Sequence, residues 1–163
     1  MTRFEELCKV YTKAEEDFRN YRWKSIEFVT QMAKGLANYL ECEIDDIRYY
    51  LPVKDGQPKE AHLIDALLLD NDTFWHFGMG VNLYVEGNKM PAMTYIFDLA
   101  LKGEDEYIIR VLKEKKEFNI NPAEREDFKS LYNFIYDSIK NRFEDELGKF
   151  LHHKSFEHFP EYG

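Results

Sequence analysis

DTFWHFGMGVNLYVEG, residues 72–87, alternates between two kinds of side chain, as the residues of a β-strand do. One alternate set is entirely apolar: Trp75, Phe77, Met79, Val81, Leu83 and Val85. The other set mixes aromatic, polar and charged side chains with two glycines: Phe74, His76, Gly78, Gly80, Asn82, Tyr84 and Glu86. The stretch therefore predicts a long strand over 72–86 whose apolar face packs on a core, with the mixed face as a candidate site.

Shorter segments of strand character lie on both sides of it. Residues 46–53 alternate and lead into the turn sequence KDGQP, residues 92–102 alternate again, and YIIRVLKEKKEF follows the turn GEDE. The run AHLIDALLLD at 61–70 fits a buried strand or a helix opened by Pro58, and we expect a strand. The chain between about 46 and 118 thus predicts an antiparallel meander of four or five strands.

The N-terminal part of the chain has helical periodicity. Apolar residues recur every three or four positions over 4–18 and again over 26–40, which predicts two helices within about 3–40, or one long helix with a bend near Tyr21. Gly35 interrupts the second segment and is typical of a close contact with another element.

The C-terminal part predicts a second helical region. Asn121, Pro122 and Glu124 form a typical helix start, and apolar residues then recur at helical spacing, so a long helix is expected over about 122–151. Together the segments predict an α+β fold: N-terminal helices, a central antiparallel β-meander of four or five strands, and a long C-terminal helix packed on the sheet. We expect a single domain over 1–163.

Composition limits the classes of function. Hydrophobic residues are 44% and aromatic residues 16% of the 163-residue chain, so it can bury a substantial core. The 22 Lys and Arg against 31 Asp and Glu give a formal net charge of -9, which disfavours nucleic acid as a partner. Charges near the N-terminus argue against a signal peptide or a membrane anchor there, so we expect a cytoplasmic protein that does not bind membranes.

The cysteines and histidines give no strong ligand pattern. Cys8 and Cys42 lack the paired spacing of a zinc or redox motif, and we expect buried free thiols. Three histidines lie in the C-terminal sequence LHHKSFEHFPEYG, at 152, 153 and 158, but without a regular spacing. We therefore predict no metal site and no cofactor.

The mixed face of the long strand is the first candidate for a ligand site. Gly78 and Gly80 remove two neighbouring side chains from one face of the strand, which opens a shallow trough. A helix or strand could fill this trough, or a ligand could. The ligand hypothesis uses five residues of this face: His76, Gly78, Gly80, Asn82 and Tyr84. His76 and Asp98 would then be its polar catalytic candidates, with Tyr50 or Arg110 added if the strand registers allow it.

A second enzymatic hypothesis rests on three charged residues. Asp98 on one predicted strand is followed, after a hairpin, by Glu114 and Lys116, and this arrangement resembles the core of the PD-(D/E)xK nucleases. The resemblance implies that the carboxylates hold a divalent metal and that the lysine orients or activates the attacking water. Phe97 stands where that family has proline, and the signatures of the common acyl-transfer and nucleotide-binding enzymes are missing from the sequence.

The sequence favours a non-enzymatic protein-binding module, although it leaves catalysis open. In its order of elements the chain is similar to bacterial secretion chaperones and to several small immunity and inhibitor proteins, an analogy of architecture that transfers no residues. We expect another protein as the partner, and the sequence leaves the oligomeric state open, a homo-oligomer included. The expected contact residues are aromatic: Tyr21, Trp23, Tyr49 and Tyr50.

Overall fold

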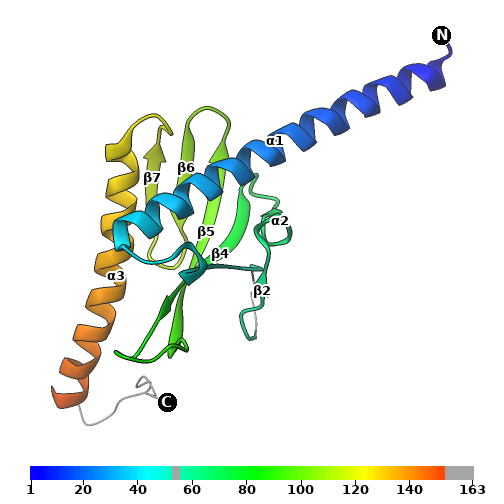
Figure 1. Ribbon diagram of the computed structural model, residues 1–163. Coiled ribbons are helices and arrows are strands. Elements are labelled where there is room, and N and C mark those ends of the chain that lie inside the picture. Colours follow the sequence, from blue (N-terminus) through cyan, green and yellow to red (C-terminus); the bar gives the residue numbers. More distant parts are fainter. Residues whose placement is uncertain (53–55, 153–163) are drawn as a thin grey trace.

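The computed structural model describes residues 1–52 and 56–152 and has the predicted α+β architecture, in which one long helix precedes the strands of an antiparallel sheet along the chain and another follows them (Figure 1). The elements in chain order are α1 (Arg3–Leu40), the 3-10 turn η1 (Ile44–Asp46), β1 (Ile47–Tyr50), β2 (Glu60–Ala61), α2 (Leu63–Ala66), β3 (Leu68–Leu69), β4 (Trp75–Leu83), β5 (Met93–Gly103), β6 (Tyr107–Val111), β7 (Lys116–Ile120) and α3 (Arg125–His152). The strands are ordered β2-β1-β4-β5-β6-β7, and the short β3 pairs separately with β4.

Strand β4 confirms the alternation on which the fold prediction depends. Its apolar set is buried from Trp75 to Val81, and β4 pairs with β5 along its whole length. Strands β4 to β7 follow one another as a meander, as predicted, while β1 and β2 extend the sheet on the other side of β4. The strand is shorter than the predicted 72–86, because a tight turn precedes Trp75 and Leu83 is the last residue paired with β5.

Helix α1 is one continuous helix rather than two. A capping box begins it: the Glu5 backbone N–H donates to Thr2 Oγ1 (3.1 Å), and the Thr2 N–H donates to Glu5 Oε2 (2.8 Å). The helix ends at Glu41, which adopts a left-handed conformation (φ 59°) and whose N–H bonds to two carbonyls of the last turn.

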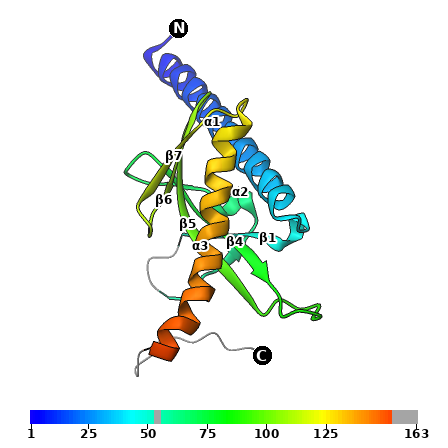
Figure 2. The same ribbon diagram turned by 90° about the vertical axis from the view of Figure 1, so that its left-hand side faces the viewer.

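The core lies between the sheet and the C-terminal half of α1, with α3 packed alongside. The apolar face of α1 after Ser25 is buried against the alternate apolar set of the strands, and α3 adds Leu131 and Ile135 to the same cluster. Figure 2 shows α1 and α3 together beside the sheet. The two helices are in close contact where Gly35 lies against Tyr132, whose hydroxyl donates to the carbonyl of Met32 (2.8 Å), so the predicted close contact at Gly35 is confirmed.

The prediction of a strand over 61–70 is wrong. The segment folds as the short strand β2, the single helical turn α2 and the two-residue strand β3. Ala66 and Leu67 are fully buried, whereas Ile64 and the two β3 leucines stay exposed, so the leucine run does not form a buried strand. The ambiguity arose because four apolar residues in a row satisfy the patterns of both a helix and a strand.

The C-terminal helix begins three residues later than predicted. The side chain of Asn121 accepts a hydrogen bond from the N–H of Ala123 (3.0 Å), and the N–H of Glu124 bonds back to the carbonyl of Asn121. These bonds form a separate turn, so Pro122 lies in that turn and α3 starts at Arg125. The sequence signal was that of a polar turn ahead of the helix rather than of the helix itself.

Candidate functional site

The glycine trough on β4 is filled by neighbouring strands. A β-carbon built on Gly78 would lie 2.9 Å from Tyr50 Cβ, and one on Gly80 would lie 2.6 Å from Thr94 Cγ2 and 2.8 Å from Tyr50 Cε2. Both glycines are buried, and Tyr50 on β1 occupies the space that their missing side chains leave, together with Thr94 and Ile96 on β5. The glycines therefore make room for Tyr50, as in the strand-packing alternative considered from the sequence.

The remaining residues of the proposed ligand set do not converge on one point. Asn82 accepts a hydrogen bond from the hydroxyl of Thr94 on β5 (2.7 Å). Tyr84 lies beyond the end of β4 and donates to a carboxylate oxygen of Asp46, at the other end of the strand from His76. Each side chain thus has a separate partner in a neighbouring element.

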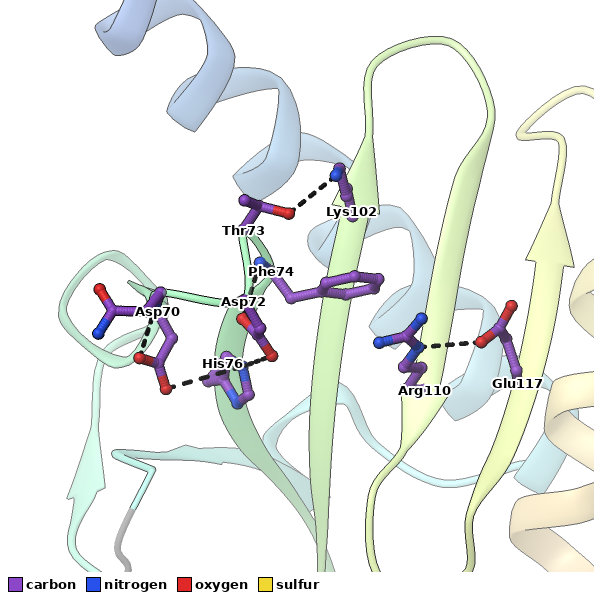
Figure 3. A network of polar contacts seen from close by, with 9 residues as sticks. Asp70, Asp72, Thr73, Phe74, His76, Lys102, Arg110 and Glu117 are labelled. Atoms are coloured by element: carbon purple, nitrogen blue, oxygen red, sulfur yellow. Dashed lines mark hydrogen bonds and ion pairs between the residues drawn. The ribbon is translucent and has the colours of Figure 1, made fainter.

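His76 belongs to a polar cluster at the start of β4 (Figure 3). Its Nε2 lies 2.8 Å from Asp72 Oδ2 and 3.9 Å from Asp70 Oδ2, while its side chain is only 15% exposed. The ligand atoms of these three residues lie within 4.8 Å of one another, and they form a group of potential metal ligands in the part of the chain that the structure describes. Nothing in the sequence pattern pairs these residues, and no metal site is predicted from it.

The turn between β3 and β4 brings the two carboxylates to the imidazole. Thr73 adopts a left-handed conformation (φ 71°), its N–H donates to the carbonyl of Asp70, and the N–H of Asp70 donates to the carbonyl of Phe74. Asp72 Oδ1 accepts the N–H of Phe74 (3.0 Å), which leaves Oδ2 facing His76. The turn geometry therefore decides which side chains meet, and residue spacing alone does not reveal it.

Electrostatics favours the ionised form of Asp72. Desolvation acts to raise the pKa of this carboxyl, but hydrogen bonds from the Phe74 N–H and from His76 outweigh it, and the pKa is lowered overall. The positive charge of Arg110 lowers the pKa of Asp72 by a smaller amount. The Arg110 guanidinium lies 4.1 Å from the centre of the Phe74 ring and donates a hydrogen bond to Glu117 (2.9 Å). Carboxylates and imidazole are suitable ligands for several divalent metals. The same contacts also account for a folded turn without any metal.

The proposed nuclease residues lie on different faces of the sheet. Lys116 pairs with Val111, and Val111 pairs with Leu99, so Lys116 is on the face of Leu99. Asp98 precedes Leu99 in the same strand and therefore lies on the opposite face. Glu114 is in the turn between β6 and β7. The structure does not bring these three groups together, so the geometric requirement of the nuclease hypothesis is not met.

Of the four aromatic residues expected to contact a partner, Trp23 is the one that is well exposed, at 57%. Tyr21 packs against Trp75, with 5.7 Å between the ring centres, and Tyr50 covers the glycines of β4. Tyr49 is half-buried against the core, and this burial raises the pKa of its hydroxyl. Three of the four side chains thus contribute to packing within the chain.

A row of exposed apolar side chains lies on the first half of α1. Every residue from Met1 to Asn20 is exposed, and Figure 1 shows this part of the helix projecting away from the sheet. We call residues 3–20 the arm. One side of the arm carries an apolar row, the arm stripe, made of Phe4, Leu7, Tyr11, Ala14 and Phe18, with Val10 beside it.

The sequence shows the arm stripe, but its exposure follows from the fold. Helical spacing of apolar residues over 4–18 predicts a helix face that packs on another element, and such a face ordinarily belongs to the core of its own chain. Here the sheet lies beneath the later part of α1, and the stripe first meets it at Phe18, whose ring lies 5.8 Å from that of Trp75. Cys8 lies on the arm and is exposed, so the prediction of a buried thiol is wrong there, while Cys42 is partly buried and both are free.

No family model, no curated protein and no solved structure matches this chain. Among the described residues, no helix is both long and apolar enough to cross a membrane.

Proposed function

We propose that this protein is a non-enzymatic protein-binding module and that the arm stripe is its binding surface. The observation that carries the proposal is the exposure of large apolar side chains on the half of α1 that projects beyond the core. Phe4 is 73% exposed and Tyr11 is 67% exposed. Contiguous apolar surface of this kind is unfavourable in water and is typical of interaction sites.

The construction of α1 supports this proposal. Most of the stability of a helix in a protein comes from packing, so the projecting arm gains its order from the part of α1 that continues into the core. The capping box at Thr2 and the intrahelical ion pairs Lys13–Asp17 and Glu15–Arg19 further stabilise the arm. Several charged side chains of the arm thus have partners within the helix, while the apolar side chains of the stripe from Phe4 to Tyr11 stay exposed.

The test compares two neighbouring residues that lie on different faces of α1. Tyr11 lies on the arm stripe and Thr12 beside it, both are exposed, and Tyr11→Asp and Thr12→Asp add the same charge to the same turn. Mass spectrometry identifies the proteins that bind to the tagged wild-type protein, and untagged copies of this chain count among them. Each such protein is then purified and titrated against the wild type and the two variants by calorimetry.

We expect Tyr11→Asp to weaken binding of the purified partner at least tenfold and Thr12→Asp to leave it nearly unchanged. Equal affinities of the two variants would contradict the proposal. So would the absence of any purified protein that binds the wild type directly.

A further inference from the structure

We propose that the partner of the arm is the arm of a second copy of this chain, packed antiparallel about a two-fold axis between Tyr11 and Ala14. This inference rests on the proposed function and adds the identity of the partner. It is carried by the spacing of the arm stripe, by the position of the sheet along α1, and by the size and charge of the residues that would meet.

The arm stripe has the spacing of a helix-pairing seam. Its residues are separated by alternating steps of three and four, and the same steps continue through Tyr21, Ser25 and Phe28 to Met32. The later positions pack on the chain's own core, which includes Phe28 and Met32. The arm is thus the part of a continuous seam that has no sheet beneath it, and a helix is the element that such a seam accepts.

The position of the sheet decides the orientation of the two helices. A parallel partner would run its own α1 along the seam beyond residue 18, into the space that the sheet of the first copy fills (Figure 1). An antiparallel partner instead overlaps the arm, and its own sheet begins at its Phe18, opposite Leu7 of the first copy, so the two sheets lie at opposite ends of the pair. The isologous two-fold arrangement closes with two chains.

The side chains that meet in this arrangement complement one another in size. With the axis between Tyr11 and Ala14, the large Tyr11 faces the partner's Ala14, and Leu7 faces the partner's Phe18. A parallel pair in register would place Tyr11 on Tyr11 and Ala14 on Ala14, which alternates crowding with empty space. Large-to-small pairing therefore favours the same orientation as the position of the sheet.

The end of the arm would reach further apolar surface on the partner. Phe4 would lie level with the partner's Tyr21, whose ring packs on Trp75 of its own chain where α1 enters the core. Close to this point the guanidinium of Arg22 donates to the carbonyl of Ile64, and Ile64 and Leu68 are both exposed. The surface offered to the partner's N-terminus thus continues the arm stripe.

Charge and area are both compatible with pairing. Residues 1–24 contain six Lys and Arg against five Asp and Glu, whereas residues 25–163 contain 16 against 26. Antiparallel arms therefore meet through a nearly neutral segment while they hold the acidic remainders apart. Aromatic side chains bury about 150–250 Å² each, so the arm stripes of two copies supply on the order of 1,000 Å², where specific interfaces begin.

Spin-label distances test the partner and the orientation together. The native cysteines of the full-length protein are first removed by Cys8→Ser and Cys42→Ala. A single cysteine is then introduced for the label, either by Thr12→Cys next to the axis or by Lys24→Cys beyond the arm. Both labelled positions and Cys8 are exposed. A rise of about 1.5 Å per residue predicts about 35–40 Å between labels at position 24, and less than about 20 Å at position 12.

Two results overturn the inference. Short distances at both positions indicate parallel arms. The absence of any intermolecular distance, with the mass of a single chain at micromolar concentration, excludes a second copy as the partner. In that case the calorimetric comparison of Tyr11→Asp with Thr12→Asp against another purified protein still decides the proposed function separately. Addition of Tyr11→Asp to the Lys24→Cys protein is expected to abolish the long distance, and its persistence contradicts the role of the stripe.

Discussion

The contact between Gly35 and Tyr132 joins the two long helices, and it gives a prediction that can be worked out atom by atom. A β-carbon on Gly35 would lie 2.2 Å from Tyr132 Oη and 3.0 Å from Cζ. The Gly35→Ala variant must therefore displace a buried ring, at about 1–3 kcal/mol for overpacking. It also breaks the 2.8 Å hydrogen bond to the Met32 carbonyl, which adds about 0.5–1.5 kcal/mol.

Alanine recovers about 1 kcal/mol of helix propensity, so the expected net loss of unfolding free energy is about 0.5–3.5 kcal/mol. The Tyr132→Phe variant alone should lose about 0.5–1.5 kcal/mol. In the Tyr132→Phe protein the nearest atom to the new methyl group is a ring carbon at 3.0 Å, so Gly35→Ala should be close to neutral there. The two substitutions are thus expected to couple by about 0.5–3.5 kcal/mol, the whole loss that Gly35→Ala causes in the wild type.

Urea unfolding followed by circular dichroism measures the four free energies of this cycle. The reasoning is refuted if Gly35→Ala is as stable as the wild type, because the methyl group would then have room. It is refuted equally if the two losses simply add, because the hydroxyl would then not be the atom that the new methyl group meets.

Three further results are expected. Gly80→Ala should lose about 1–3 kcal/mol of unfolding free energy in urea, because its methyl group would lie 2.8 Å from Tyr50 Cε2, and an unchanged midpoint would argue against a filled trough. Because the pKa of Asp72 is lowered on folding, its stabilisation is present above the unfolded pKa of about 3.9 and is lost as the pH falls through the native pKa. The stability difference between the wild type and Asp72→Asn should therefore shrink below about pH 4 in unfolding curves, whereas growth on acidification contradicts the sign. At concentrations too low for association, Tyr11→Asp and Thr12→Asp should each change the unfolding free energy by less than about 0.5 kcal/mol, and a larger loss for Tyr11→Asp would mean that Tyr11 packs within its own chain.

The sequence predicted the strands well where one face of a strand is buried. In β4 the alternation from Trp75 to Val81 predicts a buried apolar face, and the structure buries that set, together with Gly78 and Gly80 of the other face. Residues 61–70 have no such alternation. Ala66 and Leu67 are buried while Leu68 and Leu69 are exposed, and neither the helical nor the strand period describes that pattern.

The candidate sites were less predictable because they depend on contacts between elements. The space over Gly80 is filled by Tyr50, about 30 residues earlier in the chain, and the pairing of β1 with β4 is what places it there. The meeting of His76 with Asp72 follows from the left-handed Thr73 in the turn. The arm stripe is visible in the sequence, but only the position of the sheet shows that the stripe is uncovered.

The mass of the native protein in solution tests the central claim most directly. Sedimentation equilibrium of the wild type at micromolar concentration should give the mass of two chains, and the same experiment on Tyr11→Asp should give one. The Thr12→Asp protein, with the same added charge beside the stripe, should stay at two. A wild type with the mass of a single chain, or a Tyr11→Asp variant that keeps the mass of two, would contradict the account of the arm as an antiparallel dimer interface.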